Sequence, residues 1–496
     1  MSPFSALEDL LDQPDIVDRV RAGIIGDDAT LDGPFGPKPL VYADYVASGR
    51  ALTLIEEVVS SRILPFYANT HSRASFVGEF CTSLREEARS RISRLLDVGQ
   101  AHSTIFSGSG ATSGLNRLVR LLDIEALVRN GGRATVLIGP YEHHSNILPW
   151  RETGADVVEI EEAPSGGPSL SDLEARLRAS AGSDVIVGSF SAASNVTGKL
   201  TDTDEVTRLL RSYKALSVWD YACAAPYLPM TIGKGGVEKD AMVFSAHKFV
   251  GGPGASGVLI VRDDLVRRTT PTQPGGGTVS YLSPWDHRYS ARLCDREEAG
   301  TPNVLGDIRA AMVLMVKEKL GIDWLLSRQA AMRQKAEHEW ARIPEIEILG
   351  GTGFSDALPI FSFRVRDATG RLVHHQLFTR MLSDLCGIQA RGGCSCAGAY
   401  AHRLLGIDRK ASKRILSDID LGIEASKPGW VRLNFSPLLT DQKADYIIES
   451  VAALAKQVSS FERLYEVDQK NARYTAKAAG KSPIVAESVD VMAPAV

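Results

Sequence analysis

Short apolar runs alternate with helical patterns through most of the first 300 residues. From about residue 104 the apolar runs are "STIFSG", "ATVLIGP", "ADVVEIEE", "DVIVGSFS", "LSVWDYA", "AMVFSAH" and "GVLIVR". They are short, β-branched and apolar at consecutive positions, which is typical of strands buried on both faces of a parallel sheet. The segments between them favour helices, for example "SLSDLEARLRASAG" and "DTDEVTRLLRSYKA". The alternation predicts an α/β layered domain with right-handed crossovers between its strands.

The pattern changes after a long helical stretch over residues 299–343. Three apolar runs follow it, "IEILGG", "LPIFSFRV" and "WVRLNFS", and helical segments separate them. This layout predicts a second, smaller α+β domain. The expected organisation is an N-terminal arm over 1–40, a large domain over 41–310, a small domain over 311–466, and a tail over 467–496. The tail has little periodicity and is expected to be disordered.

Composition narrows the class of protein. The chain has 496 residues, a net charge of −4 and 44% hydrophobic residues, which is enough for a large core in more than one domain. The near-neutral charge and the lack of a basic run argue against a nucleic-acid partner. The sequence contains no stretch of about 18 apolar residues, which is the length that a helix needs to span a membrane. The N-terminus has no secretory signal pattern, and six cysteines do not make a disulfide framework. The chain is therefore expected in the cytoplasm, with reduced thiols.

One segment has the pattern of an anion-binding loop. "FSGSGATSGLNRL" runs from a strand through a Gly- and Ser-rich turn into a helix. Free backbone N–H groups and hydroxyls at a helix N-terminus bind phosphate well, so Gly110, Ala111 and Thr112 would meet it. A plain strand-to-helix turn, capped by Ser or Thr, would give a similar sequence.

Three further polar residues follow apolar runs. His143, in "YEHHSNILPW", comes just past a strand, where ligands of parallel sheets bind, although a packed structural histidine is the simpler explanation. No Asp, Glu or Cys follows the two histidines at metal-ligand spacing, so no metal is expected. Asp220 ends "LSVWD", where an aspartate is often a turn residue or an N-cap. Lys248 ends the next run, "AMVFSAHK". Lysine and aspartate on neighbouring strand ends, beside a phosphate loop, are explained jointly by pyridoxal 5'-phosphate. The lysine would bind the cofactor covalently and the aspartate would keep its pyridine nitrogen protonated.

Nine segments in order resemble one enzyme family. They are "YADYVASGR", "THSRA", "SGSGATSGLN", "YEHHSNILPW", "SNVTGKL", "WDYACAAPY", "SAHKFVGGPGASGVL", "EEAGTPN" and "RGGCSCAGA". Over about residues 40–460 the chain resembles the class V, fold-type I pyridoxal-phosphate enzymes, and within them the cysteine desulfurases and selenocysteine lyases. The resemblance implies a fold-type I transferase, whose large domain has a mostly parallel, seven-stranded sheet and whose smaller C-terminal domain is α+β. It also implies a homodimer with its site at the subunit interface.

The resemblance further implies roles for individual residues. Lys248 resembles the lysine that anchors the cofactor and moves the substrate Cα proton, His143 the imidazole that stacks on the ring, and Asp220 the partner of the ring nitrogen. The other residues expected at the cofactor are Gly110, Ala111, Thr112, Asn195, Ser245, His247 and Thr301, of which Thr301 would reach the phosphate of the neighbouring subunit. The residues expected at the substrate are His71, Asn195, Arg391 and Arg432, and the two guanidinium groups suit its carboxylate.

Cys223 departs from the pattern of the sulfur-mobilising enzymes. It stands where these usually have a glutamine that hydrogen-bonds the ring hydroxyl of the cofactor. A thiol is a poorer donor than an amide, so this contact is expected to be weakened.

The segment "RGGCSCA" bears on the reaction. It resembles the Arg-x-Gly-x-x-Cys-Ala pattern of the desulfurases, which puts Cys396 at the thiol that takes up sulfur as a persulfide. A thiolate on a glycine-rich loop near arginine would be activated. A buried structural thiol is the plainer alternative, and a metal site is disfavoured because Cys394 and Cys396 lack the C-x₂-C spacing. The expected reaction converts L-cysteine to L-alanine and leaves the sulfur on Cys396, for transfer to a sulfur-acceptor protein.

Other outcomes stay open at this point. Cys394 falls where the family often has histidine, and the molybdenum-cofactor sulfurases also carry Cys-x-Cys here. The segment "YAHRLLGIDRKASKRILSDIDLGIEASK" is longer than a typical connection and could shape a lid or admit a larger substrate. The same framework supports an aminotransferase, a C–S lyase or an epimerase acting on another amino acid. A binding module that keeps the fold without the chemistry is the non-enzymatic alternative.

Overall fold

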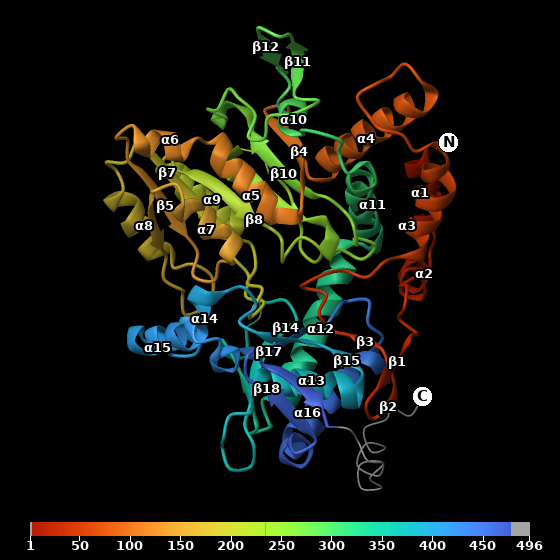
Figure 1. The fold of residues 1–496 in the computed structure, drawn as a ribbon, viewed down its shortest axis with the longest axis vertical. Coiled ribbons are helices and arrows are strands. Elements are labelled where there is room, and N and C mark those ends of the chain that lie inside the picture. The colour runs from red at the N-terminus through yellow and green to blue at the C-terminus, as the bar shows by residue number, and fades with distance from the viewer. Residues whose placement is uncertain (1, 234, 355, 478–496) are drawn as a thin grey trace. The chain divides into compact units, whose positions relative to one another are not determined.

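The chain folds into two compact units. The computed structural model describes residues 2–233, 235–354 and 356–477. The first unit comprises the chain up to Ile24, Ser48–Ser194 and Leu200–Leu325, and the second comprises Ile25–Ala47, Asn195–Lys199 and the chain from Leu326 onward (Figure 1). None of the described helices combines the length and the apolar character needed to cross a bilayer.

A seven-stranded sheet forms the centre of the first unit. Its strands, in spatial order, are β4 (His102–Gly108), β10 (Gly257–Arg262), β9 (Ala241–Ser245), β8 (Leu216–Asp220), β7 (Val185–Ser191), β5 (Ala134–Ile138) and β6 (Asp156–Glu159). The pairs from β9 to β6 are parallel, whereas β10 is antiparallel to both β4 and β9. The prediction of a mostly parallel, seven-stranded sheet is confirmed. The apolar run of β10 could not reveal its direction, because any central strand is buried on both faces.

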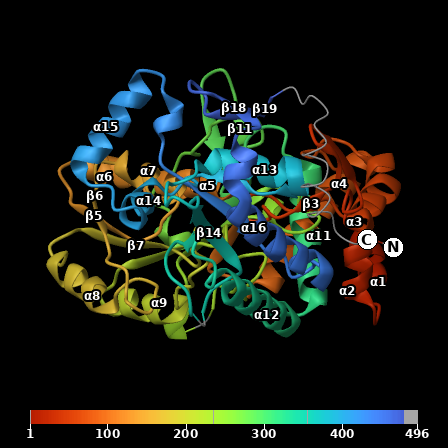
Figure 2. The same ribbon diagram turned by 90° about the horizontal axis from the view of Figure 1, so that it is seen from below.

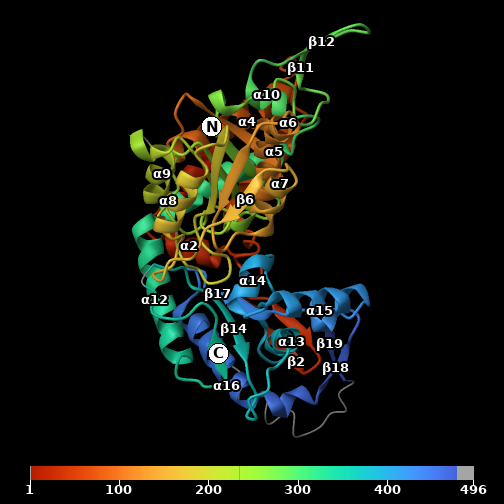
Figure 3. The same ribbon diagram turned by 90° about the vertical axis from the view of Figure 1, so that its left-hand side faces the viewer.

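Helices cover both faces of this sheet. α5 (Gly110–Leu121), α6 (Ile124–Arg129) and α7 (Leu148–Arg151) lie on one face, and α8 (Leu170–Ala179) and α9 (Thr203–Ser212) lie on the other (Figure 3). Local chemistry sets their starts: Ser169 and Asp202 cap α8 and α9 by accepting hydrogen bonds from first-turn amides.

The remaining elements of the first unit surround this core. They are α1 (Pro3–Leu11), α2 (Ile16–Ala22), α3 (Thr53–Val58), α4 (Phe76–Leu95), α10 (Leu293–Glu297) and α11 (Val304–Leu320). A hairpin of β11 (Val279–Leu282) and β12 (His287–Tyr289) projects from the sheet (Figure 3). The start of the chain, predicted as an arm, is a packed helix, because Phe4, Leu7 and Leu11 of α1 bury one face.

The second unit is built on a four-stranded antiparallel sheet. Its spatial order is β13 (Ile346–Ile348), β14 (Ile360–Val365), β17 (Trp430–Asn434) and β16 (Arg391–Gly393). α13 (His375–Cys386) and α16 (Asp441–Glu462) pack side by side in this unit (Figure 2). α12 (Ile322–Trp340) contributes Trp340, whose ring lies 5.0 Å from that of Phe361 in the buried core.

Shorter elements complete the second unit. They are β1 (Thr30–Gly33), β2 (Gly36–Pro39), β3 (Val41–Tyr42), β15 (Ile388–Gln389), α14 (Gly398–Leu404) and α15 (Arg409–Asp420). β3 and β15 form a short parallel pair. α14 and α15 occupy the long segment that follows the Cys394–Cys396 loop.

The end of the described chain also differs from expectation. β18 (Tyr465–Asp468) pairs with β19 (Arg473–Ala476), so residues 467–477 form part of a hairpin and not a structureless tail. The ring of Tyr474 lies 5.2 Å from that of His374. Strands of four residues are too short to produce a clear period in the sequence. The rest of the predicted tail, 478–496, lies outside the described residues.

Candidate cofactor and substrate site

The first unit brings Asp220 and Lys248 to one edge of the sheet. Asp220 ends β8, and a 3₁₀ turn that contains Lys248 follows directly after the parallel neighbour β9. Asp220 is 5% exposed, and its Oδ1 accepts a hydrogen bond from the backbone N–H of Ala222 at 2.8 Å. Burial raises the pKa of Asp220, and the nearby positive charge of Lys248 acts in the opposite direction. The predicted lysine–aspartate pair is thus electrostatically coupled.

The predicted phosphate loop packs against the turn that carries Lys248. Gly110 has a φ of +73°, and a Cβ there would lie 2.8 Å from both His247 Cε1 and Ser245 Oγ. The backbone N–H of Ala111 donates to Ser245 Oγ at 2.9 Å. Burial lowers the pKa of His247, and the charge of Lys248 lowers it further. The loop residues Gly110 and Ala111 therefore pack against Ser245 and His247, so closely that position 110 has no room for a side chain.

His143 is held in a defined orientation beside this loop. Its Nδ1 accepts a hydrogen bond from the backbone N–H of Ser145 at 3.1 Å. A ring nitrogen that accepts an N–H carries no proton, so the neutral ring is protonated at Nε2. Ser145 Oγ lies 3.0 Å from the same Nδ1 and 2.7 Å from Thr112 Oγ1. Ser145, which sequence reasoning missed, connects the predicted residues His143 and Thr112.

Glu142 is a second residue that sequence reasoning missed. It is 2% exposed, and its carboxylate accepts hydrogen bonds from the Ser191 backbone N–H at 2.7 Å and from Asn146 Nδ2 at 2.6 Å. Burial raises its pKa to about 7, against the effect of these hydrogen bonds, and the negative charge of Asp220 raises it too. The sequence signal for Glu142 is an acid that follows the end of β5 by four residues and directly precedes His143.

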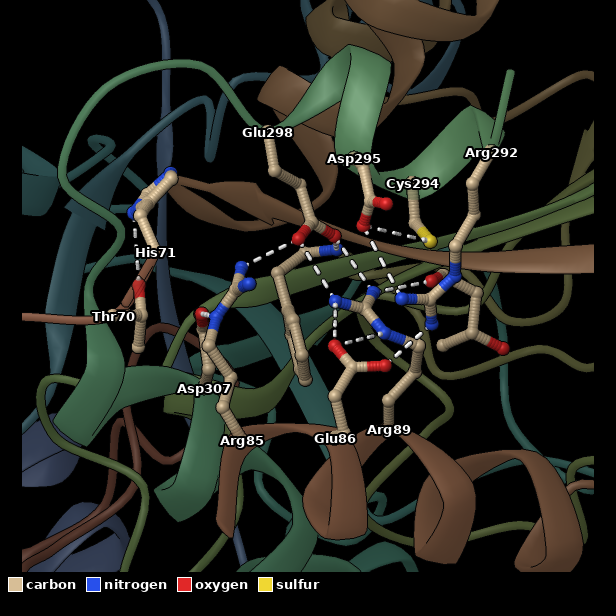
Figure 4. Close-up of polar contacts among 12 residues, drawn as sticks. Thr70, His71, Arg85, Glu86, Arg89, Arg292, Cys294, Asp295, Glu298 and Asp307 are labelled. Carbon is tan, nitrogen blue, oxygen red and sulfur yellow. Dashed lines mark hydrogen bonds and ion pairs between the residues drawn. The ribbon is translucent and has the colours of Figure 1, made fainter. Parts of the chain in front are cut away.

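A buried ion-pair network supports the segment that contains Thr301. The Glu298 carboxylate accepts hydrogen bonds from the Arg89 guanidinium at 2.7 and 2.9 Å, from Arg85, and from the backbone N–H of Phe106 in β4 at 2.8 Å. Figure 4 shows these side chains converging from α4 and from the segment that follows α10. Burial alone would raise the pKa of Glu298, but the two arginines hold it below its usual range. Glu298 thus ties the strand before the phosphate loop to the segment before Thr301.

Three further predicted residues of this unit lie outside the contacts described above. Thr301 is exposed and lines a cavity of about 470 Å³ together with Thr112. His71 is exposed, has a φ of +79°, and places its Nδ1 3.2 Å from Thr70 Oγ1 (Figure 4). The thiol of Cys223 is buried and lies 3.7 Å from the carbonyl oxygen of Ser194.

The second unit gathers the two predicted arginines around one acid. Asp44 Oδ1 accepts from Arg432 Nη2 at 2.7 Å, and its Oδ2 accepts from Arg391 Nε at 3.0 Å. Asp44 lies in the quoted segment "YADYVASGR", but sequence reasoning gave it no role.

The same unit positions the two loop cysteines and Asn195. Asn195 Nδ2 donates to the carbonyl oxygen of Ser395 at 2.8 Å, and Arg432 Nη1 donates to the carbonyl oxygen of Asn195 at 3.3 Å. Cys396 is exposed, whereas Cys394 is half-buried. Ser395 and Cys396 both have left-handed backbones, with φ values of 54° and 55°. Asn195 therefore fixes both the Ser395 carbonyl, directly before Cys396, and the Arg432 guanidinium group.

The sheet order, the parallel crossovers and the lysine turn agree with the fold-type I architecture expected from the sequence. The sequence model of the family described as Aminotransferase class-V matches residues 41–417. The chain belongs to this family.

Relatives and solved structures are consistent with that assignment. The chain is 27% identical over 377 residues to a "Probable cysteine desulfurase" of Halalkalibacterium halodurans, covering 74% of this chain and 86% of that protein. It is 27% identical to a cysteine desulfurase of Salmonella agona, covering 77% and 89%. A cysteine desulfurase structure from Thermococcus onnurineus superimposes with a TM-score of 0.71 at 22% identity, covering 88% and 98%. One from Escherichia coli gives 0.69 at 21%, covering 88% and 98%.

Proposed function

We propose that this enzyme is a cysteine desulfurase, which converts L-cysteine to L-alanine and takes up the sulfur on Cys396. The observation that carries the proposal is the loop of Cys396. It presents one exposed thiol on a backbone that is hydrogen-bonded to Asn195, which in turn binds a buried arginine. An exposed thiol beside a carboxylate-binding arginine suits an amino acid whose side chain is itself a thiol.

The first unit fits pyridoxal 5'-phosphate. Position 110 admits no side chain, so the backbone at the start of α5 packs directly against Ser245 and His247, and a phosphate would be held at this helix N-terminus. Asp220 is a buried carboxylate and would hold the pyridine nitrogen, while Lys248 would be the covalent anchor. Ser245, His247 and the predicted residues of the loop would surround the phosphate. When bound, the cofactor supplies an electron sink that weakens the bonds at the substrate Cα.

The chain's own groups would carry out the remaining steps. Asp220 would keep a proton on the ring nitrogen, and the His143 ring would lie against one face with its proton on Nε2. The Lys248 amine would take the Cα proton. Arg391 and Arg432 would hold the substrate carboxylate. The Cys396 thiolate would then form an S–S bond to the substrate sulfur as the C–S bond breaks. The electron pair of the broken bond stays with Cβ, which picks up a proton. Lys248 would return the other proton to Cα, and the product leaves as alanine.

We extend the proposal to the protein's partners. A second copy would complete the site, since Thr301 is exposed and its segment is rigidly supported by Glu298. His71, on an exposed turn of the same unit, would belong to the substrate site. A sulfur-acceptor protein would then unload Cys396. Sedimentation of the cofactor-loaded protein tests the dimer, and a monomer at working concentration would contradict it.

Product analysis tests the reaction. The cofactor-loaded protein is incubated with L-cysteine without reductant, and its intact mass and the small-molecule products are measured. Alanine together with a mass gain of one sulfur atom, absent in Cys396→Ser, is the expected result. Pyruvate with free sulfide would instead establish a C–S lyase. Lys248→Ala should lose the visible absorbance of the bound cofactor, and a variant that kept it would overturn the anchor assignment.

A further inference from the structure

Asp44 is the common partner of the two arginines assigned to the substrate carboxylate. Its two oxygens bind Arg432 Nη2 at 2.7 Å and Arg391 Nε at 3.0 Å. The Arg432 side chain is only 4% exposed and that of Asp44 12%, whereas that of Arg391 is 47% exposed. One carboxylate therefore bridges a buried guanidinium group and a half-exposed one.

The backbone around Asp44 is fixed on both sides. The backbone N–H of Val46 donates to Asn434 Oδ1 at 3.0 Å, and the Asn434 N–H donates to the Ala43 carbonyl at 2.8 Å. The Ala43 N–H in turn donates to the Gln389 carbonyl at 3.0 Å. These contacts anchor Asp44 to β17 and to the end of β15, which lies two residues before Arg391. Asp44 is thus held on a rigid support, which is what a residue that aims two other side chains requires.

The charges of this cluster do not cancel. Two guanidinium groups face one carboxylate, which leaves a single positive charge. Among the described residues Arg432 Nε has no hydrogen-bond partner, although the side chain is buried. A buried cation with an unused donor is costly unless an anion completes it. The cluster is therefore set up to accept one further anionic group.

We propose that Asp44 is a positioning and specificity-determining residue of the substrate site. It aims both arginines and cancels one of their two charges, so the site matches amino acids with one carboxylate and an uncharged side chain. A substrate with a second carboxylate would bring one negative charge too many. This inference rests on the proposed role of Arg391 and Arg432 in the substrate site.

A role in folding alone would have a different signature. Loss of Asp44 would then lower stability, as loss of any buried ion-pair partner does, without changing the preference between ligands. Asp384 provides the matched control, because it is a buried aspartate of the same unit that pairs with Arg380 at 2.7 Å on α13. The deciding quantity is a ratio of dissociation constants, which a general loss of stability does not move.

The experiment uses the cofactor-loaded full chain with L-alanine and L-aspartate as probes. Binding is followed by the change in the visible absorbance of the cofactor. Asp44→Asn should favour aspartate over alanine by about tenfold or more relative to the parent protein, because one positive charge is released. Asp44→Glu should keep the preference for alanine, and Asp384→Asn should leave the ratio unchanged. For L-cysteine, Asp44→Asn should raise KM more than it lowers kcat.

A compensating variant keeps the test decisive if Asp44→Asn folds poorly. Arg391→Gln removes one charge from a half-exposed side chain and should weaken binding of both probes, aspartate more strongly. The double variant Asp44→Asn/Arg391→Gln restores the single positive charge and should return the ratio toward the parent value. An unchanged ratio in Asp44→Asn, with alanine still formed from cysteine, would overturn the inference and leave the proposed function standing. A shifted ratio in a protein that forms no alanine from cysteine would support the role of Asp44 and overturn the proposed function.

Discussion

The Glu142 carboxylate accepts a hydrogen bond from the backbone N–H of Ser191 at 2.7 Å, and Ser191 is the residue that pairs with Asp220 between β7 and β8. A second buried carboxyl group therefore lies one strand away from the candidate partner of the cofactor nitrogen. Glu142 also precedes His143 directly. A change in the charge of Glu142 would therefore act on both residues predicted to contact the cofactor ring, Asp220 and His143.

The first prediction concerns stability against pH. The pKa of Glu142 is raised from 4.5 to about 7 by burial. Between these values the folded state keeps a proton that the unfolded chain releases, so stability falls as pH rises from about 4.5 to about 7. The loss attributable to Glu142 is of the order of 3 kcal/mol. Glu142→Gln should make this slope shallower by that contribution in urea unfolding of the cofactor-free protein between pH 5 and pH 8.

An exposed acid serves as the control for that measurement. Glu125, on α6, is 64% exposed, so Glu125→Gln should keep the slope of the parent protein. If Glu142→Gln also kept the parent slope, Glu142 would not titrate in this range, and the coupling to Asp220 would have to be abandoned.

The second prediction concerns the network in Figure 4. Glu298→Gln leaves Arg89 and Arg85 without their shared carboxylate in a buried site. The free energy of unfolding should fall by about 3 kcal/mol, because the two buried guanidinium groups would then keep only one carboxylate partner each, Asp307 for Arg85 and Glu86 for Arg89. Glu86→Gln, at a partner of Arg89 whose side chain is 29% exposed, should cost about 1 kcal/mol or less. Denaturant unfolding measures the free energy of unfolding of both variants. Equal losses would show that Glu298 contributes no more to stability than Glu86.

The third prediction concerns the phosphate loop. Gly110→Ala places a Cβ 2.8 Å from Ser245 Oγ, at a backbone with positive φ. The variant should retain cofactor poorly, with a dissociation constant raised at least about tenfold, which corresponds to about 1.4 kcal/mol. Gly131→Ala shares the positive φ of +87° but meets nothing within 4 Å, so it carries the backbone strain alone. Equilibrium dialysis measures the dissociation constant of the cofactor for both variants. Equal affinity would show that the steric contacts at position 110 do not affect cofactor binding.

Much of the fold could be predicted from the sequence because its signals are local. The seven apolar runs gave the strands of the large sheet, and Asp220 and Lys248 could be placed at strand ends by their position after such runs. Long-range pairing was not accessible in the same way. Asp44 lies about 350 residues from Arg391 and 390 from Arg432 in the chain, and only the folded second unit reveals that it bridges them. Glu298 was missed for the same reason, since its partners come from α4 and β4.

The last prediction concerns the order of reactivity among the six cysteines. Cys396 is exposed and Cys394 half-buried, while Cys81, Cys223, Cys294 and Cys386 are buried. Burial also raises the pKa of Cys294 and of Cys386 to about 11, which leaves little thiolate at neutral pH. Iodoacetamide should therefore label native protein first at Cys396, then at Cys394, and at the buried thiols only after unfolding. After incubation with L-cysteine, Cys394→Ser should still gain the persulfide and Cys396→Ser should not. Peptide mass spectrometry reads both results. A persulfide on Cys394 in the Cys396→Ser variant would instead make Cys394 the nucleophile.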